Sequence, residues 1–254
     1  MFRPGTYQSF GYDVLNRITS ANGPWGSASF GYNVQGDRTI KSIGSAITNY
    51  SYSNNKLTGQ TGKSYQYNGA NIIQSGSTSF TYDPFDNIQT SNTGKVTSRY
   101  LYDAKNNRVS KTSGGVTTLY HHGPTGDVLA ELNSAGAGLV DYIYLNKTLV
   151  ARSQAKTDVA FYDTDNTGTP VALWDGAGKK TWEGEYYPFG EEFRVVESSA
   201  SNKKRFIGKE KDSETGLTYF GARYMDETTG RFLSPDPVRP VDPFTSKTNA
   251  QLLT

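Results

Sequence analysis

Pairs of aromatic residues return along this chain at nearly fixed intervals, and an acidic or amide residue follows most pairs. The rings stand at alternate positions, as in Phe80-Thr81-Tyr82-Asp83. Looser versions follow at 142–144 and 161–163. A fixed period of this size is typical of repeat architectures, in which each unit is one supersecondary element covered only by its neighbours. The second rings of the regular pairs are separated by 20, 20, 15, 15 and 20 residues and are Tyr12, Tyr32, Tyr52, Tyr67, Tyr82 and Tyr102.

The pattern within one unit predicts a β-hairpin. Residues two apart on a strand point to the same face, so both rings of a pair lie on one side. Short runs of Asp, Asn, Gly and Pro follow the pairs, as at 83–87 and 106–107, and they favour tight turns. No stretch shows a 3.6-residue apolar period over three turns, which a surface helix would require. We therefore predict an all-β fold with one antiparallel hairpin per repeat.

The composition narrows the possible functions. Hydrophobic residues make up 35% of the chain, which suits a sheet with one wet face. The net charge of +2, from 26 basic and 24 acidic residues, gives no electrostatic case for nucleic-acid binding. The absence of cysteine rules out a disulfide framework, a thiolate nucleophile and a Cys-type zinc site. No apolar run approaches the roughly 18 residues of a membrane span, and no secretion signal is visible. We expect no membrane insertion and no cofactor.

Two segments suggest a metal site, and each has a simpler interpretation. Residues 163–168 resemble the start of a calcium loop, but Trp174 stands where the loop needs a bidentate Glu, so we predict a turn. His121 and His122 are the only histidines. No cysteine and no carboxylate at ligand spacing stands beside them. We therefore predict that they replace the aromatic pair of one repeat on a strand, and we expect no metal site.

Two further features could bind ligands. Lys203-Lys204-Arg205 with Lys209 and Lys211 could attract an anion, but acidic residues at 210 and 212 interrupt the run, so we predict a solvated loop. The rows of Tyr could stack on sugar rings. Alternatively, rings of adjacent hairpins stack on each other, at about 0.2–1 kcal/mol per cross-strand pair. The regular spacing favours the second interpretation.

After about residue 180 the regular spacing ends and a denser string of residues begins. It includes 185–190 (EYYPFG), 205–212 (RFIGKEKD), 216–226 (GLTYFGARYMD) and 230–237 (GRFLSPDP). This string resembles the core region that closes the repeats of bacterial rearrangement-hotspot (Rhs) proteins. The upstream hairpins resemble the YD repeats of the same family, which is related to toxin-complex C subunits and to teneurins. The residues that we assign to the core motif are Gly221, Arg223, Tyr224, Asp226, Gly230, Arg231 and Phe232.

The resemblance implies a shell. In the family, YD hairpins line up in a curved, spiral sheet that forms a hollow β-cocoon around a C-terminal toxin domain, and the core region caps one end. It implies YD repeats over 1–180, the Rhs-associated core over 181–237 and a Pro-rich tail over 238–254. The implied partners are the rest of the Rhs shell and its toxin domain, and a secretion-apparatus protein is a further candidate. The implied location is secreted or delivered to a cell surface from a bacterium.

Many members of the family also cleave themselves with a pair of aspartates. Asp236 matches the first of them. The second lies in a downstream Asn-Pro and Asp-Pro-x-Gly segment, which this chain does not contain before Thr254, and Asp242-Pro243 does not replace it. We therefore expect a non-catalytic shell segment. A cell-surface adhesion or carbohydrate-binding module is the alternative, and a residual autoprotease is a third hypothesis.

The expected size of the sheet sets a further limit. About twenty strands, ~4.8 Å apart, give a sheet roughly 95 Å wide. Closed into one ring, that sheet is ~30 Å across, and inward side chains remove on the order of 10 Å more. A folded cargo of about 100 residues is over ~30 Å wide and would not fit. Either the repeats form an arc of a larger wall, or the chain curls up and fills its own interior. This size limit supports the expectation that the chain is a piece of something longer.

Overall fold

The structure is a computed structural model that describes residues 7–155, 158–198 and 202–237. The regular elements in these ranges are strands, apart from one short 3-10 helix. The strands form one sheet of 20 strands and one of 4. The predicted all-β fold of antiparallel hairpins is confirmed. Among the described residues, no helix has the length and apolarity needed to cross a membrane.

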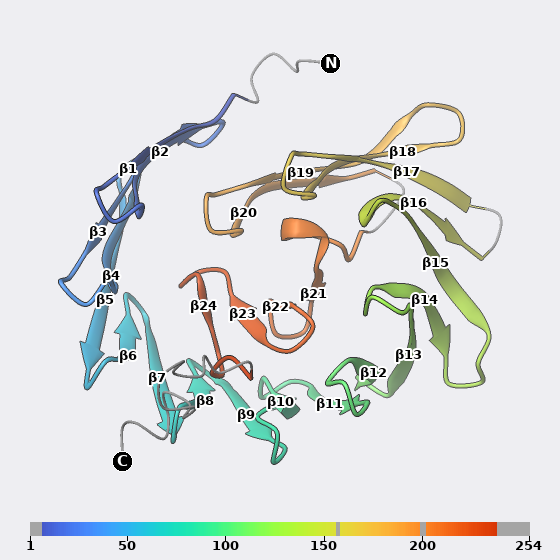
Figure 1. The fold of residues 1–254 in the computed structure, drawn as a ribbon, viewed down its shortest axis with the longest axis horizontal. Helices are drawn as coiled ribbons and strands as arrows, with labels where there is room; N and C mark the ends of the chain where they lie inside the picture. The colour runs from blue at the N-terminus through green and yellow to red at the C-terminus, as the bar shows by residue number, and fades with distance from the viewer. Residues whose placement is uncertain (1–6, 156–157, 199–201, 238–254) are drawn as a thin grey trace, which may run out of the picture.

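The large sheet, here called the wall, pairs each strand antiparallel with the next one along the chain. It curves around a common centre (Figure 1). Its first half consists of β1 (Ser9–Tyr12), β2 (Ile18–Gly23), β3 (Gly26–Tyr32), β4 (Arg38–Ile43), β5 (Ala46–Ser53), β6 (Lys56–Gln60), β7 (Lys63–Asn68), β8 (Asn71–Ser75), β9 (Thr78–Tyr82) and β10 (Ile88–Asn92). Its second half consists of β11 (Thr97–Tyr102), β12 (Arg108–Ser113), β13 (Val116–His122), β14 (Val128–Asn133), β15 (Gly138–Leu145), β16 (Thr148–Gln154), β17 (Asp158–Thr164), β18 (Pro170–Asp175), β19 (Lys180–Tyr186) and β20 (Glu192–Glu197).

One turn recurs through the wall and explains the acidic residue after the aromatic pairs. In the β9–β10 turn, the backbone N–H groups of Phe85 and Asn87 donate to Asp83 Oδ1 at 2.8 and 3.0 Å. Asp86 has a φ of 63°, the left-handed conformation that a tight turn of this kind needs. The same pair of side-chain bonds forms around Asp13, Asp103, Asp165 and Asp175. The predicted turn over 163–168 is found at 165–168, whereas Asp163 and Thr164 still belong to β17 (Asp158–Thr164).

The repeat aromatics point to the inner face of the wall. From Phe30 onward the first ring of each regular pair is buried, as for Phe80 and Tyr100, which are 5% and 2% exposed, whereas Phe10 of the first hairpin is 39% exposed. The residue between the rings points outward, and Leu101 is 62% exposed. This alternation follows from the two-residue period of a strand. The curved wall therefore has an aromatic inner face and an outer face in contact with solvent.

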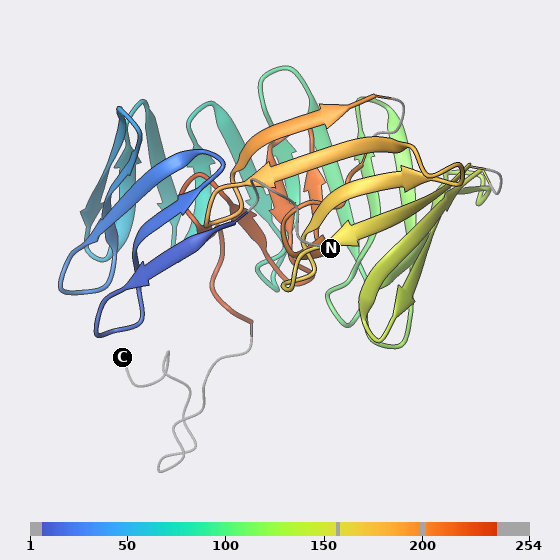
Figure 2. The same ribbon diagram turned by 90° about the horizontal axis from the view of Figure 1, so that it is seen from above.

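The elements from η1 to β24, within residues 202–237, fold inside the curve of the wall (Figures 1 and 2). The wall itself continues through β20, past the boundary expected at 180. The chain then enters the interior and forms a small antiparallel sheet, here called the inner sheet. Wall aromatics such as Tyr100 share one buried cluster with Leu217, Tyr224 and Leu233 of the interior. The elements of the interior are η1 (Phe206–Gly208), β21 (Glu210–Asp212), β22 (Leu217–Tyr219), β23 (Tyr224–Asp226) and β24 (Arg231–Phe232).

The two ends of the wall meet through side chains of the β19–β20 turn. The ring of Phe189 lies edge-on to Phe30 of β3, with 5.2 Å between centroids. Tyr187 lies 5.5 Å from Trp25, at the β2–β3 turn. The described chain thus curls around and fills its interior with its own C-terminal residues, which is the second of the two arrangements that the sheet width allowed.

Candidate functional site at the junction of wall and inner sheet

A buried arginine of the wall forms the centre of the junction. Arg108, at the start of β12, is only 1% exposed. Its Nη1 lies 2.7 Å from Asp212 Oδ2, and its Nη2 lies 2.8 Å from Glu210 Oε1, both on β21. The same two nitrogens donate to the hydroxyl oxygens of Tyr224 at 2.9 Å and Tyr120 at 3.1 Å. The guanidinium of Arg108 therefore binds two strands of the inner sheet at once: β21 through its two carboxylates and β23 through Tyr224.

Lys111, on the same strand, adds a second cation to these carboxylates. Its Nζ lies 2.7 Å from Asp212 Oδ1 and 3.4 Å from Glu210 Oε1. Burial acts to raise the pKa of Glu210, but Arg108 and Lys111 outweigh it and hold that pKa well below its ordinary range. The carboxylates in turn raise the pKa of Lys111 against the opposing effect of burial. Glu210 and Lys111 are therefore ionised at neutral pH, although both are largely removed from water.

A second wall arginine repeats this arrangement at β4. Arg38 is 6% exposed, and its Nη2 donates to the Tyr50 hydroxyl at 2.9 Å and to the Thr228 carbonyl at 3.1 Å. Its guanidinium carbon lies 4.5 Å from the centre of the Phe189 ring. Arg38 and Arg108 follow the aromatic pair of their hairpins at the same distance, so the repeat places both on the inner face. Arginine at this repeat position binds the interior to the wall.

In four hairpins the hydroxyl of the second ring bonds to the backbone of the preceding hairpin. The Tyr102 hydroxyl donates to the carbonyl oxygen of Ile88 at 2.8 Å. Tyr67 is half-buried, with Lys56 Nζ 5.4 Å from its ring centre, and Tyr12 of the first hairpin is 58% exposed. Hydroxyl bonds equivalent to that of Tyr102 run from Tyr32 to Ile18, from Tyr52 to Arg38 and from Tyr82 to Ile72.

The histidines correct one detail of the sequence interpretation. Tyr120 and His122, not the two adjacent histidines, occupy the pair positions, because only residues two apart share the inner face. Tyr120 is buried, and His121 is exposed on the outer face. His122 Nε2 lies 2.9 Å from the Arg108 carbonyl oxygen, which is the contact that Tyr makes elsewhere. Among the described residues, no group of three His, Cys, Asp or Glu could hold a metal ion.

Several core-motif residues face the wall. Asp226 Oδ2 lies 2.7 Å from Lys63 Nζ on β7, and its Oδ1 accepts the Thr228 backbone N–H at 3.0 Å. Arg231 Nη1 lies 2.9 Å from Oδ1 of Asp37, the residue just before β4. Together with the contacts of Arg108, these bonds bind the inner sheet to the wall from β4 to β12.

The remaining core-motif residues shape the inner sheet itself. Gly221 and Gly230 have φ angles of 100° and 65°, which favour glycine. The Arg223 guanidinium lies 3.8 Å from the centre of the Phe232 ring, and its Nη2 lies 2.7 Å from Asp236 Oδ2. The side chain of Asp236 is 50% exposed. The Pro-rich tail and Asp242-Pro243 lie outside the described residues.

The basic run after β20 packs between the interior and the wall, so the prediction of a solvated loop is wrong for Lys204, although the side chain of Lys203 is 44% exposed. Lys204 is 4% exposed. Lys203 Nζ lies 2.6 Å from Glu131 Oε2, and Arg205 Nε lies 2.9 Å from Glu192 Oε1. Sequence reasoning missed this because Glu131 stands on β14, 72 residues before Lys203, and Glu192 meets Arg205 only where the chain folds back after β20. The acidic residues that appeared to interrupt the run are themselves partners of wall cations.

The comparisons with known proteins agree with the fold. A sequence profile of the Teneurin YD-shell family matches residues 6–252, so the chain belongs to this family. It is 29% identical over 239 residues to the tRNA3(Ser)-specific nuclease WapA of Bacillus spizizenii, a match that covers 89% of this chain and 10% of that protein. It is 31% identical over 160 residues to toxin subunit YenC1 of Yersinia entomophaga, a match that covers 61% of this chain and 16% of that protein.

The solved structures give the same result for the fold. The Photorhabdus luminescens Tc holotoxin pore contains a region similar to this chain, with a TM-score of 0.73 at 18% identity, covering 91% of this chain and 14% of that one. The resemblance to YD-repeat proteins and the shell-type sheet are thereby confirmed. The chain spans 10% and 16% of the lengths of the two relatives named above.

Proposed function

We propose that this chain is a structural, non-catalytic segment of a toxin-delivering shell, in which the inner sheet plugs the curve of the wall. The observation that carries the proposal is the set of buried ion pairs centred on Arg108, which fixes the inner sheet to the wall. A cluster of ionised groups buried in this way is costly unless every partner stays in place. Its use is therefore to hold one defined arrangement of core and wall.

The proposal places the toxin outside this segment. The interior here is filled by β21 to β24, and the relatives are much longer chains whose names describe a nuclease and a toxin subunit. Further wall repeats and a toxin domain would come from other parts of such a protein, and a secretion-apparatus protein remains a candidate partner. The names of these relatives support the further proposal that the protein is secreted or delivered to another cell.

The other hypotheses gain no specific support. A sugar-binding platform needs exposed rings, whereas the repeat aromatics from Phe30 to Tyr142 include a buried ring in each of the regular hairpins. For autoproteolysis, the described residues contain Asp236 and its partner Arg223, and the second aspartate of the family motif is not in the sequence.

Limited proteolysis of the longer protein that carries both this segment and the proposed toxin domain tests the proposal. We expect its toxin domain to resist limited proteolysis when the core is intact and to become accessible in an Arg108→Met variant. Arg99→Met is the matched control, because Arg99 lies on the outer face of neighbouring β11. A toxin domain that is digested equally in all three proteins would contradict the proposed shell.

A further inference from the structure

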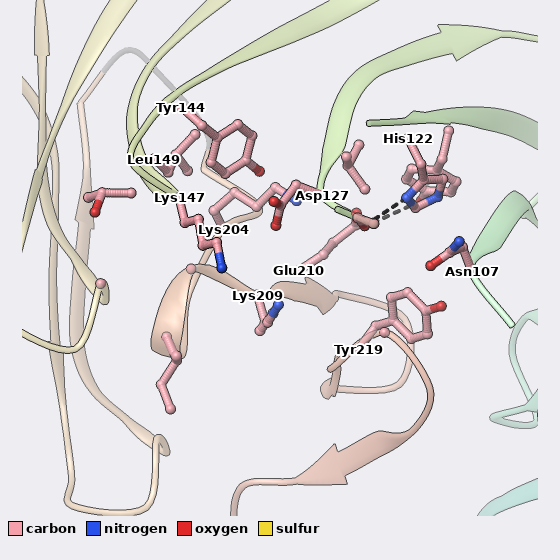
Figure 3. A pocket seen from close by; sticks show the side chains of 18 of the residues that line it. Asn107, His122, Asp127, Tyr144, Lys147, Leu149, Lys204, Lys209, Glu210 and Tyr219 are labelled. Atoms are coloured by element: carbon pink, nitrogen blue, oxygen red, sulfur yellow. Dashed lines mark hydrogen bonds between the residues drawn. The ribbon is translucent and has the colours of Figure 1, made fainter. Parts of the chain in front are cut away.

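A cavity of about 360 Å³ lies where wall turns meet the start of the inner sheet. Its lining comes from the turns that follow β13, β15 and β17 and from the segment 204–210 (Figure 3). The labelled side chains of Lys147, Lys204 and Lys209 gather on one side of this cavity, and those of His122 and Asn107 lie on the other. The cavity is therefore bounded by both the wall and the interior.

The ionisable groups of the lining leave an excess of positive charge. Arg108, Lys147, Lys204 and Lys209 line the cavity together with only two carboxylates, those of Asp127 and Glu210. Arg108 and Glu210 already neutralise each other at 2.8 Å. Three ammonium groups then remain against the single carboxylate of Asp127, which accepts a hydroxyl hydrogen bond at 2.8 Å.

Lys204 is the unusual member of this group. It is 4% exposed, and its Nζ lies 4.6 Å from the centre of the Tyr142 ring. Among the described residues no carboxylate lies at ion-pair distance from this Nζ, although the charges of Glu210 and Glu131 act on it from farther away. Burial lowers its pKa, because the charged form loses its water. Other lysines that contact the interior have carboxylate partners, namely Lys41, Lys63, Lys111, Lys203 and Lys211. A buried ammonium without such a partner is costly unless something else supplies the negative charge.

We propose that this cavity binds a dianionic oxyanion of the phosphate class, with Lys204 at the buried end of the cavity and Lys147 and Lys209 at its sides. A dianion matches the excess of ammonium groups better than a monoanion. The volume exceeds that of a few waters, each of which occupies about 30 Å³. There is room for a small organic group on the phosphate, beside the rings of Tyr144 and Tyr219. A ligand held here would contact wall and core together and strengthen their junction.

Binding of inorganic phosphate to the whole chain tests this inference. We expect phosphate to raise the melting temperature by several degrees over chloride at equal ionic strength, and calorimetry to show saturable binding. Lys204→Met should weaken binding at least tenfold while keeping the β-type dichroism spectrum, because it removes a buried charge and retains apolar volume. Lys209→Ala, at the side of the cavity, should weaken binding severalfold.

Lys179→Met is the matched control, because Lys179 is exposed in the β18–β19 turn away from the cavity. Its phosphate binding should equal that of the unaltered chain. A chloride response as large as the phosphate response, or unchanged binding in both Lys204→Met and Lys209→Ala, would overturn the site. An acetate response equal to that of phosphate would contradict the assignment to a dianion.

Discussion

Replacing Arg108 with Met removes the cation that joins the wall to the inner sheet. The variant keeps the apolar stem but leaves Glu210 and Asp212, which are 3% and 0% exposed, with Lys111 as their nearest remaining cation. It also takes away the donors to the hydroxyl groups of Tyr120 and Tyr224. Breaking a buried pair by removing one partner typically costs about 3–5 kcal/mol. We therefore expect the free energy of unfolding to fall by that amount.

Urea unfolding followed by tryptophan fluorescence measures this loss. For a domain of roughly 150–250 residues, about 2–4 °C of melting temperature corresponds to 1 kcal/mol, so the melting temperature should fall by roughly 10 °C. Arg99→Met, on the solvent side of the adjacent strand, should change stability by less than about 0.5 kcal/mol. If Arg108→Met costs no more than Arg99→Met, the junction does not hold the fold together and the reasoning is refuted.

The dependence on pH gives an independent check. The folded-state pKa of Glu210 lies below its ordinary value of 4.5. Its contribution to the free energy of unfolding is therefore complete above pH 4.5 and is lost as the pH falls toward the folded-state pKa. Without Arg108 the effect of burial is less opposed, and the pKa of Glu210 should rise. In the variant, the protonated carboxyl of Glu210 fits the buried site better than the charged one. Its stabilising effect on the fold is therefore present at low pH and is lost as the pH rises. The cost of Arg108→Met should therefore be smaller near pH 5 than near pH 7.

The repeat itself allows further predictions. Tyr82→Ala should lower the free energy of unfolding by about 2–4 kcal/mol in the same urea assay, because it empties part of the aromatic inner face. Tyr102→Phe should cost about 1 kcal/mol, since it leaves the Ile88 carbonyl without its donor, and Tyr12→Phe should cost almost nothing because Tyr12 is exposed. His122→Tyr should fold with at least the original melting temperature, because Tyr makes the same contact in other hairpins; a clear loss would show that the repeat positions are not equivalent.

The fold could be predicted from the sequence because its information is local. Alternating rings define an inner face, and an acidic or amide residue after several of the pairs accepts N–H groups of its own turn, as Asp83 does. Both features act within a few residues. The consecutive order of the strands follows from the hairpins, since each strand pairs with its neighbour along the chain.

The junction could not be predicted in the same way, because its partners lie far apart in sequence. Arg108 and Asp212 are 104 positions apart. One signal was available, however. Ile18 and Ile88 stand at the repeat position where Arg38 and Arg108 stand in their own hairpins. A charged residue at an inward position that is otherwise apolar needs a buried partner of opposite charge. Comparison of the repeats would have predicted that such a partner exists, but it would not have identified Asp212.

The closing of the curve was also beyond local patterns. The aromatic string at 185–190 was assigned to the core by resemblance, and its rings meet Trp25 and Phe30 at the opposite end of the wall. Such contacts depend on the accumulated curvature of the strands between them. The expected width of the sheet left two arrangements, an arc of a larger wall or a closed curve with a filled interior. The presence of β21 to β24 inside the wall shows the second.

Zero-length cross-linking tests the central claim, that the C-terminal residues lie inside the wall and are bound to it. A carbodiimide joins an ammonium to a carboxylate only where the two are in contact. Lys63 Nζ lies 2.7 Å from Asp226 Oδ2, and Lys63 is partly accessible to the reagent. Mass spectrometry should find the peptide of Lys63 joined to that of Asp226. Lys63 linked only to carboxylates of the wall, with Asp226 linked elsewhere, would contradict the account.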